Sequence, residues 1–455
     1  MTSEITRREF LRSSSVAGLG VTLAGLPRIG AAMANSKIRV LAIGFGTIGN
    51  KDLTQVALHN MVEIAGLCDI DEDTLAAVST GYPGAFTCRD YRVAFTDHVD
   101  KFDAVIVATP DHSHAPIMLT AFENDKHIYG QKPLVHQLEE LQLIERAIHA
   151  KPHLVTQLGN QRMVYPGRRA AVEILRSGDL GKAVAAYVWT GSPGGDFYFN
   201  SAHILSPPSV PPPNIDFDLW LGPCKVRPYR EHLLPRVWRS WWDFGTSGLG
   251  DWGVHILDVI FFAYDELTSP IAVKTHAPAP SDTFHTYPCQ STITYSVDSA
   301  HFAHRQFPIY YNDRGQGPSR ASLGLPGDVW SDSNMTVVVC EGGVLSLTPE
   351  GELEIWREGS MTPGLEMPGL PHFPELNHRH AWIDTINGVD TELRTPFSDG
   401  VRITEAALLA VKASRFPGQE LLWDNASLSF TNHAEATKSI VKRDYREGFA
   451  PPLVG

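Results

Sequence analysis

The stretch that decides the fold reads Lys37-Ile38-Arg39-Val40-Leu41-Ala42-Ile43, followed at once by Gly44-Phe45-Gly46-Thr47-Ile48-Gly49. The apolar run predicts a buried strand, and the G-x-G-x-x-G motif predicts a tight turn into a helix at about residues 50–60. The first glycine permits the turn, the second lets the backbone approach a pyrophosphate, and the third lets the helix pack closely on the strand. The N-terminus of that helix then faces the phosphates.

A second strand and an acidic residue complete this unit. Residues 62–68 predict a strand, and Asp69 follows it, 20 residues after Gly49. A carboxylate at this position accepts a hydrogen bond from the adenosine ribose and repels a 2′-phosphate, so NAD is favoured over NADP. The unit therefore predicts a dinucleotide-binding domain. Its first loop supplies the cofactor contacts Gly44, Gly46, Thr47, Ile48 and Gly49.

Two further apolar runs end in polar segments. Residues 104–108 predict a strand that leads into Thr109-Pro110-Asp111-His112-Ser113-His114, and residues 127–130 predict one that leads into Gln131-Lys132-Pro133. Parallel sheets bind ligands at the carboxyl ends of their strands, so Thr109, Pro110 and Lys132 are candidate cofactor contacts. His112 and His114 either contact the cofactor or cap the turn.

The remainder of the chain, residues 158–455, predicts a second domain for substrate binding and oligomerisation. A helix is expected at 167–177, and strands are expected at 183–190, 271–275, 290–297, 334–340 and 344–348. These strands predict an α+β domain with a large, mostly antiparallel, open-faced sheet. We expect substrate specificity to lie in loops at 191–215 and 308–332. Trp242, in an aromatic-rich stretch, either stacks on a sugar or packs in the core.

A glycine-rich segment of this second domain carries an acid and a base. Residues 245–250 open into an apolar helix, on which Asp251 and His255 lie four residues apart on one face. Taken alone, such a pair is more often a structural hydrogen bond. Beside Lys132 and a dinucleotide domain, it indicates a catalytic group of Lys132, Asp251 and His255.

The glycine motif, the Ala108-to-His114 segment, Gln131-Lys132-Pro133 and the Asp251/His255 segment together resemble the family of glucose–fructose oxidoreductase and inositol dehydrogenase (Gfo/Idh/MocA). The resemblance implies a Rossmann domain at 35–157 and a C-terminal segment that packs back on it. It also implies that Lys132 and His255 act at the nicotinamide and that Asn160, Gln161 and Arg162 contact substrate and cofactor. Most members have Glu where this chain has Gln131, which predicts weaker electrostatic support for the charged form of Lys132.

The predicted activity is hydride transfer between a tightly held NAD and a hydroxyl of a carbohydrate or polyol. An NAD-dependent glycoside hydrolase that acts by transient C3 oxidation and elimination is the alternative, and a non-catalytic sugar-binding protein is a second one. No metal site is expected. The chain has no H-E-x-x-H motif, and Arg379 separates His378 from His380 in its densest late histidine cluster.

Composition and the N-terminus predict the setting. With 455 residues, the chain exceeds one ordinary core, and its net charge of −13 argues against nucleic acid or an anionic membrane as a partner. Arg7-Arg8, an apolar run at 16–26 and Ala32-Met33-Ala34 predict a twin-arginine signal peptide at 1–34 and hence a periplasmic protein. An exported enzyme has no nucleotide pool, so the cofactor should be retained. The open sheet predicts a homodimer or homotetramer.

Overall fold

The computed structural model describes residues 37–191, 206–231, 233–276, 286, 290–313, 317–389, 393 and 395–455. The predicted signal peptide at 1–34 lies outside the described residues, so it stays a prediction. Among the helices of the described ranges, none combines the length and the apolar character that a membrane span requires.

The first domain is a six-stranded parallel sheet with the strand order β3-β2-β1-β4-β5-β6. Its strands are β1 (Ile38–Ile43), β2 (Val62–Cys68), β3 (Phe86–Cys88), β4 (Ala104–Val107), β5 (His127–Gly130) and β6 (Thr156–Leu158). Its helices are α2 (Thr47–Ala57), α3 (Glu72–Ser79), α4 (Tyr91–Asp97), α5 (Asp111–Glu123) and α6 (Leu138–Ala150). The strand order reverses direction at β1 and β4, where such sheets bind ligands.

The strands of this sheet are apolar along their length because helices cover both faces. Every residue of β4 is buried, and β1 is buried at five of its six positions. One face packs into a cluster with Leu41, Val105 and Ile128, and the other into a separate cluster with Val40, Ala42 and Ile106. This is the continuous apolar pattern expected of a parallel sheet buried on both sides.

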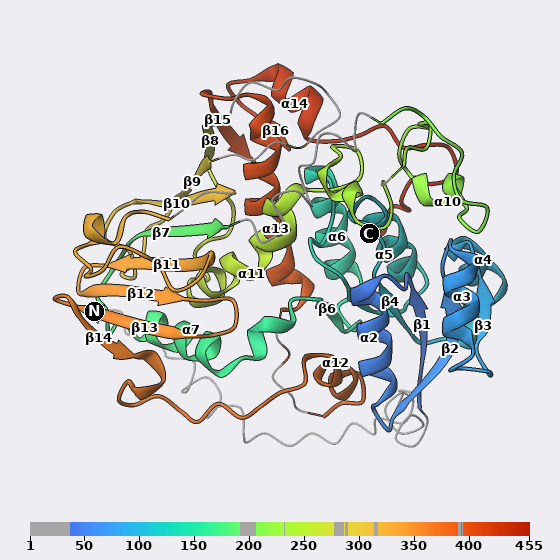
Figure 1. Ribbon diagram of the computed structural model, residues 1–455, viewed down its shortest axis with the longest axis horizontal. Coiled ribbons are helices and arrows are strands. Elements are labelled where there is room, and N and C mark those ends of the chain that lie inside the picture. Colours follow the sequence, from blue (N-terminus) through green and yellow to red (C-terminus); the bar gives the residue numbers. More distant parts are fainter. Residues whose placement is uncertain are drawn as a thin grey trace, which may run out of the picture. The chain divides into compact units, whose positions relative to one another are not determined.

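The second domain is built on a ten-stranded sheet with the order β14-β13-β12-β11-β7-β10-β9-β8-β15-β16. The strands are β7 (Ala183–Thr190), β8 (Ala272–His276), β9 (Gln290–Ser296), β10 (Gln306–Asp313), β11 (Asn334–Cys340), β12 (Gly343–Leu347), β13 (Leu353–Arg357), β14 (Ser360–Pro363), β15 (Glu420–Asp424) and β16 (Ser429–Phe430). Its strands pair antiparallel except for β7 with β10. The predicted fold class is therefore confirmed (Figure 1).

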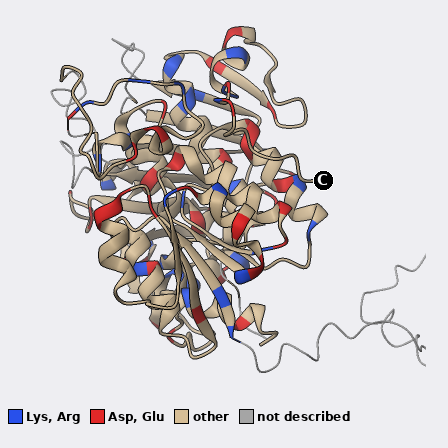
Figure 2. Cartoon of the chain, turned by 90° about the vertical axis from the view of Figure 1, so that its right-hand side faces the viewer, with Lys and Arg blue, Asp and Glu red and all other residues tan. Residues whose placement is uncertain are grey.

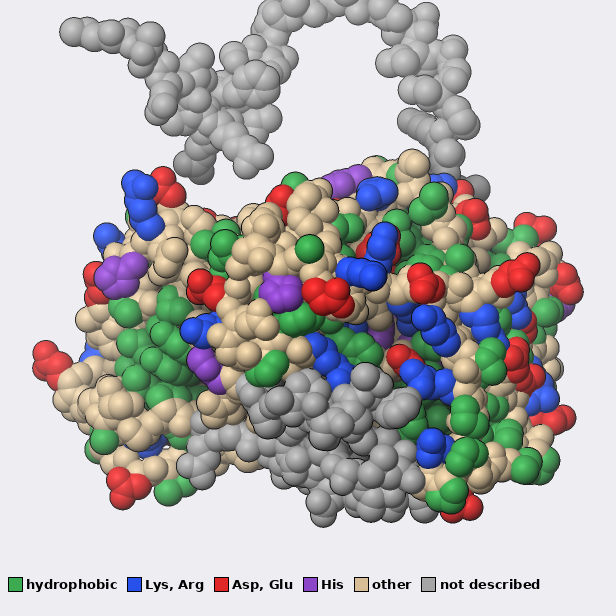
Figure 3. Space-filling view, turned by 90° about the horizontal axis from the view of Figure 1, so that it is seen from above, with side chains coloured by type: hydrophobic (Ala, Val, Ile, Leu, Met, Phe, Trp, Pro, Cys, Tyr) green, Lys and Arg blue, Asp and Glu red, His purple; other side chains and the backbone are tan. Residues whose placement is uncertain are grey.

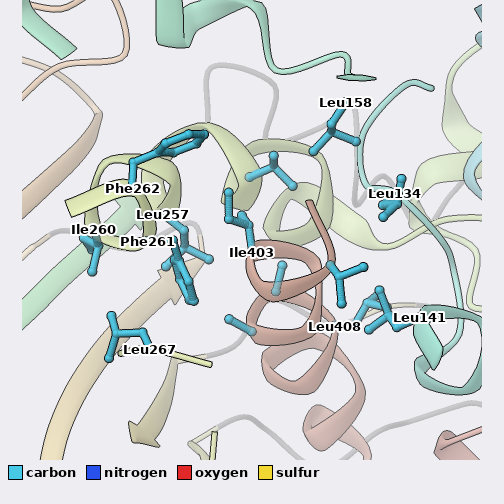
Figure 4. Packing of buried hydrophobic residues seen from close by; sticks show 14 of the residues in the cluster. Leu134, Leu141, Leu158, Leu257, Ile260, Phe261, Phe262, Leu267, Ile403 and Leu408 are labelled. Atoms are coloured by element: carbon cyan, nitrogen blue, oxygen red, sulfur yellow. The ribbon is translucent and has the colours of Figure 1, made fainter. Parts of the chain in front are cut away.

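Helices α7 (Pro166–Ser177), α11 (Ser247–Ala263) and α13 (Phe397–Lys412) join the two sheets into one core. The remaining helices are α10 (Phe217–Leu221), α12 (His378–Ile386) and α14 (Ala434–Ile440). In Figure 4, Ile403 and Leu408 of α13 lie between the α11 side chains and Leu134 and Leu141 of the first domain. Because α11 is almost wholly buried, the side chains that it carries toward the first domain are held rigidly.

One predicted loop is partly a central strand. Residues 306–313 form β10 between β7 and β9, although 308–332 was expected to be a specificity loop. Pro308 argued against a central strand in the sequence, because proline is rare in such strands. Further along, Leu325 and Trp330 pack against Trp189 on the face of the sheet opposite α11. This part of the chain therefore covers the outer face of the sheet around Trp189.

The end of the chain returns to the first domain, as expected from the resemblance. Helix α13 packs against α6, and the tail beyond α14 hydrogen-bonds to α6 through the backbone amide of Glu139 and the carbonyl of Val441 (3.1 Å). Figure 2 shows the molecule from the right-hand side of Figure 1, where positions with Lys or Arg are interspersed along the ribbon with positions that carry Asp or Glu.

Candidate active site at the carboxyl edge of the parallel sheet

A cleft of about 560 Å³ opens at the carboxyl ends of β1, β2, β4 and β5. The loops that follow these strands form its floor, and residues of the 215–239 stretch face them. Asp251 of α11 and Phe449 of the C-terminal tail complete the lining. The cleft is therefore built from both sequence motifs that predicted a site.

The glycine loop fits a pyrophosphate. Gly44 has φ +90°, and a Cβ there would lie 2.7 Å from the carbonyl oxygen of Ala108, so only glycine suits this turn. Gly46 caps α2 without any side-chain hydrogen bond, and a Cβ on it would meet nothing within 4 Å. The first amides of α2 thus face open space, which is the arrangement that binds phosphate oxygens. Thr47, Ile48, Thr109 and Pro110 also line the cleft.

Asp69 lies in the cleft with its carboxylate held by two backbone amides. Phe45 donates to Oδ2 at 2.7 Å, and Asp71 donates to Oδ1 at 3.0 Å. Burial raises the pKa of Asp69, and these two amide bonds oppose that rise. The carboxylate is thus presented beside the phosphate loop, where a ribose hydroxyl would meet it.

Lys132 and Asp251 form an ion pair that joins the two domains. Lys132 Nζ donates to Asp251 Oδ1 and also to the Asp251 carbonyl oxygen at 2.9 Å. Arg239 Nε lies 3.8 Å from Asp251 Oδ2, so the carboxylate lies between two cations. The Lys132 and Asp251 side chains are only 13% and 18% exposed. Asp251 therefore holds the Lys132 ammonium group in place across the domain boundary.

His255 is held by Asn160 instead of Asp251. Its Nδ1 lies 2.6 Å from Asn160 Oδ1, while Asn160 Nδ2 donates to Asp258 Oδ2 at 2.8 Å. Because the amide nitrogen faces a carboxylate, the amide oxygen must accept from His255, which places the imidazole proton on Nδ1. Within the described ranges, Nε2 has no hydrogen-bond partner. The neutral ring therefore carries its lone pair on Nε2.

A buried ion pair anchors this arrangement. Arg168 of α7 donates to Asp258 Oδ1 and to the backbone carbonyl of His255, and both side chains of the pair are fully buried. The resulting chain of contacts runs from Arg168 through Asp258 and Asn160 to His255. Burial, followed by the positive charge of Lys132, holds the pKa of His255 well below its usual value. The imidazole is consequently a neutral base at neutral pH.

Gln131 does not face the Lys132 ammonium group. Its Nε2 donates to the buried carboxylate of Asp52 at 2.6 Å, and Asp52 also pairs with Arg379 of α12 at 2.6 Å. The acidic partner of Lys132 is Asp251, from the other domain. Lys132 therefore has a direct carboxylate partner, Asp251, although residue 131 is a neutral amide.

Three residues predicted to contact cofactor or substrate, His112, His114 and Trp242, pack against other parts of the protein and do not line the cleft. His112 is buried between Trp220 and Phe244 and hydrogen-bonds both backbone carbonyls, and burial lowers its pKa to about 3. His114 bonds the carbonyls of Thr109 and Pro133, both at 2.8 Å. Neither imidazole is among the cleft-lining residues, so their role in the described structure is to fix the turn. Trp242 packs against Lys412 and Arg415, also outside the cleft lining.

The segment after β6, residues 160–164, contacts α11 beside the site. Asn160 reaches His255, whereas Arg162 lies over the ring of Trp252, 5.2 Å from its centroid, and pairs with Glu350. Gln161 begins the short helix Gln161–Val164, outside the cleft lining. Sequence reasoning missed Arg168, Asp258 and Arg239. Asp258 alone had a signal, because it lies three residues after His255 on the same helix.

The fold combines a parallel-sheet domain of the dinucleotide-binding type with a second domain whose helix α11 contributes Asp251 to the same cleft. Residues 38–157 match the oxidoreductase family model for the NAD-binding Rossmann fold, and residues 171–300 match the C-terminal alpha/beta domain of the same family. The two matches together span more than half of the chain. The chain therefore belongs to the Gfo/Idh/MocA oxidoreductase family.

Curated relatives match about a third of the chain or less. An inositol 2-dehydrogenase 3 of Saccharopolyspora erythraea is 31% identical over 153 residues, which is 33% of this chain and 44% of the relative. A glycosyl hydrolase family 109 protein of Shewanella woodyi is 30% identical over 120 residues, which is 25% of this chain and 26% of the relative. The chain thus spans less than half the length of these relatives.

Solved structures share the fold over most of the chain. The WlbA dehydrogenase of Bordetella pertussis, in complex with NADH and UDP-GlcNAcA, aligns with a TM-score of 0.58 at 14% identity, covering 86% of this chain and 98% of that one. An aldose-aldose oxidoreductase of Caulobacter crescentus aligns with a TM-score of 0.56 at 15% identity, covering 85% and 100%. At these identities the likeness is one of fold.

Proposed function

We propose that this protein transfers hydride between a tightly held NAD and a hydroxyl group of a carbohydrate or polyol. The observation that carries the proposal is the Lys132–Asp251 pair in the cleft lining, with His255 on the same helix as Asp251. Lys132 is fixed by Asp251, and one helical turn further along α11, His255 presents a neutral imidazole with its lone pair on Nε2.

In the proposed oxidation of an alcohol, His255, Lys132 and Asp251 have different roles. When bound, the nicotinamide ring accepts the hydride that leaves the substrate carbon. His255 Nε2 takes the proton of the hydroxyl group, because it is the basic nitrogen of a neutral ring. Lys132 donates a hydrogen bond to the same oxygen and stabilises the negative charge that develops on it. Asp251 keeps the ammonium group in place, and the reverse steps reduce a ketone.

We propose NAD as the cofactor in preference to NADP. Asp69 presents a carboxylate at the ribose position, and a 2′-phosphate there would be repelled.

A family 109 glycosyl hydrolase among the relatives supports the second candidate, an NAD-dependent glycosidase that oxidises C3 and cleaves by elimination. Both candidates use the same hydride step.

Product analysis tests the proposal and separates its two forms. Purified protein, without added nucleotide, is incubated with a panel of aldoses, inositols and aryl glycosides, and the products are identified by mass spectrometry. Net oxidoreduction should convert one sugar into a ketone or lactone while a second is reduced. Hydrolysis should release an aglycone with no net redox change. If no carbohydrate in the panel changes the redox state of bound nucleotide, the proposed substrate class is wrong.

The pH dependence of kcat/KM distinguishes the two possible bases. If His255 is the base, its imidazole must be neutral. A free imidazole has a pKa of about 6.5, and the pKa of His255 lies well below that value, so the ring stays neutral at pH 6.5. Activity should therefore stay level from neutral pH to below 6.5 and then fall as the ring becomes protonated. A rate that instead rises steadily through the alkaline range would indicate that Lys132 must lose its proton, which would contradict this assignment.

We also propose that the protein is exported to the periplasm and works as a homo-oligomer. The twin arginines at Arg7-Arg8 support export, which cell fractionation would test.

An apolar area on the second domain supports the proposed oligomer. Figure 3 shows hydrophobic side chains grouped at the left of the upper face, on the side of the ten-stranded sheet. On β10, Tyr310 is 40% exposed and stacks on Tyr187. A monomer in sedimentation velocity would contradict this part of the proposal.

A further inference from the structure

A short segment of the second domain forms a wall over one half of the nucleotide cleft. This covering segment, residues 214–225, contains α10 and begins beside the loop that follows Asp69. Ile215 forms a β-bridge with Asp71, the Glu72 amide donates to the Asn214 carbonyl at 2.9 Å, and the Asp216 amide donates to the Ile70 carbonyl at 3.1 Å. The segment is thus attached directly after the residue predicted to bind the adenosine ribose.

Side chains of the covering segment face the cleft. Ile215, Leu219 and Trp220 line it opposite the phosphate loop, together with Arg89 on the side of the first domain. Trp220 also packs on His112 and Phe244, with ring centroids 5.0 and 4.7 Å away. A dinucleotide bound to the glycine loop would therefore have this wall over its adenosine half.

The C-terminal tail, residues 441–455, fastens the covering segment from outside. Arg446 donates to the carbonyl oxygens of Gly222 at 2.9 Å and Asp218 at 2.6 Å, and it also pairs with the Asp218 carboxylate. The backbone amide of Arg446 donates to the Pro223 carbonyl at 3.1 Å. One arginine thus binds both α10, at Asp218, and the turn that follows it, at Gly222.

The same tail is anchored on two helices of the first domain. Arg443 and Tyr445 both donate to the fully buried Glu140 of α6, at 2.6 and 3.0 Å. Arg92 of α4 donates to the Gly448 carbonyl at 2.9 Å. The ring of Phe449 lies between the guanidinium groups of Arg92 and Arg446, 4.0 and 4.4 Å from its centroid, and lines the cleft.

We propose that the C-terminal tail is a clamp that locks the covering segment over the adenosine half of NAD and so prevents exchange of the nucleotide. The inference rests on the proposed function, because it assumes that NAD occupies the cleft. Release of the nucleotide requires the covering segment to move away from the loop after Asp69. That movement breaks the charge-assisted hydrogen bonds of Arg446 and separates Phe449 from its two arginines. The clamp makes the cofactor a permanent part of the enzyme.

The test measures how fast bound nucleotide exchanges in the full chain. Wild-type protein, Arg446→Ala and Phe449→Ala, each purified with its resident nucleotide, are mixed with excess radiolabelled NAD, and uptake of label by the protein is followed by filtration. Each variant should take up label about tenfold faster or more than wild type. A tenfold change corresponds to about 1.4 kcal/mol, within the strength of one charge-assisted hydrogen bond of Arg446 or of the cation–π contacts of Phe449. Circular dichroism checks that each variant is folded.

Asp444→Asn is the matched control. Asp444 lies on the same tail, but its 3.4 Å pair with Lys225 is exposed, with the Asp444 side chain 90% accessible. Exchange in this variant should stay within about twofold of wild type. If Arg446→Ala fails to fold, Phe449→Ala decides. Wild-type exchange rates in the folded variants would overturn the clamp alone, whereas a wild-type protein that binds no NAD would overturn the proposed function with it.

Discussion

Replacing Lys132 with alanine should lower kcat by about a hundred- to a thousandfold while leaving the nucleotide bound, because its ammonium group is the donor aimed at the reacting oxygen. The side chain is held in place by two contacts with Asp251, from the opposite domain. In the proposed complex the glycine loop and Asp69 supply the main nucleotide contacts, and both are unchanged in this variant. Turnover per bound nucleotide, measured with the substrate that the product screen identifies, gives the effect directly.

Lys151→Ala is the control for this substitution. Lys151 also forms a salt bridge, with Asp125 at 2.8 Å, but it lies on the surface beyond α6. Its loss should leave kcat unchanged, because it touches neither the cleft nor α11. Unchanged turnover in Lys132→Ala would contradict the catalytic assignment of this lysine, and loss of bound nucleotide would show that its role is binding.

Replacing Asp258 with alanine should lower the free energy of unfolding by about 3–5 kcal/mol, because it leaves Arg168 charged and unpaired in the core. The same change removes the carboxylate that orients Asn160, and through it His255. Activity should therefore fall in the fraction that remains folded. Urea unfolding followed by tryptophan fluorescence measures the loss of stability.

Asp125→Asn is the matched control for this buried pair. Asp125 is 57% exposed, and its pair with Lys151 should contribute no more than about 1 kcal/mol. A loss in Asp258→Ala as small as in the control would contradict the account of a buried anchor. Retention of full activity in Asp258→Ala would show that His255 does not need this chain of contacts.

The parts of the fold that the sequence predicted are those with strong local signals. Residues 183–190 form the predicted strand, and the predicted helix at 167–177 corresponds to α7, which ends at Gly178 with φ +74°. The helix that carries Asp251 and His255 follows from their spacing and its apolar run. Local propensity and hydrophobic period agree at these positions, which makes them readable.

Other parts depend on contacts between distant segments. Asn160 and Asp258 are 98 residues apart, and Arg168 and Asp258 are 90 apart, so no local pattern reveals that they orient His255. The histidines at 112 and 114 were ambiguous in the sequence, which allowed either a cofactor contact or a turn cap. Their position at a strand end suggests a ligand contact, but backbone carbonyls take up their ring nitrogens. Only the fold determines which polar groups face the cleft.

The covering segment and the tail were also beyond the reach of the sequence. Arg446 and Asp218 lie 228 residues apart in irregular or short elements, where neither period nor motif applies. The tail carries several charged residues that would ordinarily read as solvated surface. Its function follows only from the fact that α10 and the cleft lie beneath it.

The central claim, a resident NAD that serves hydride transfer, is tested most directly by the nucleotide content of the purified protein. Protein prepared without added cofactor is denatured, and the released small molecules are quantified by mass spectrometry against the protein concentration. The account predicts NAD or NADH at close to one per chain, with little NADP. Release of no nicotinamide nucleotide, from protein that is folded, would contradict it.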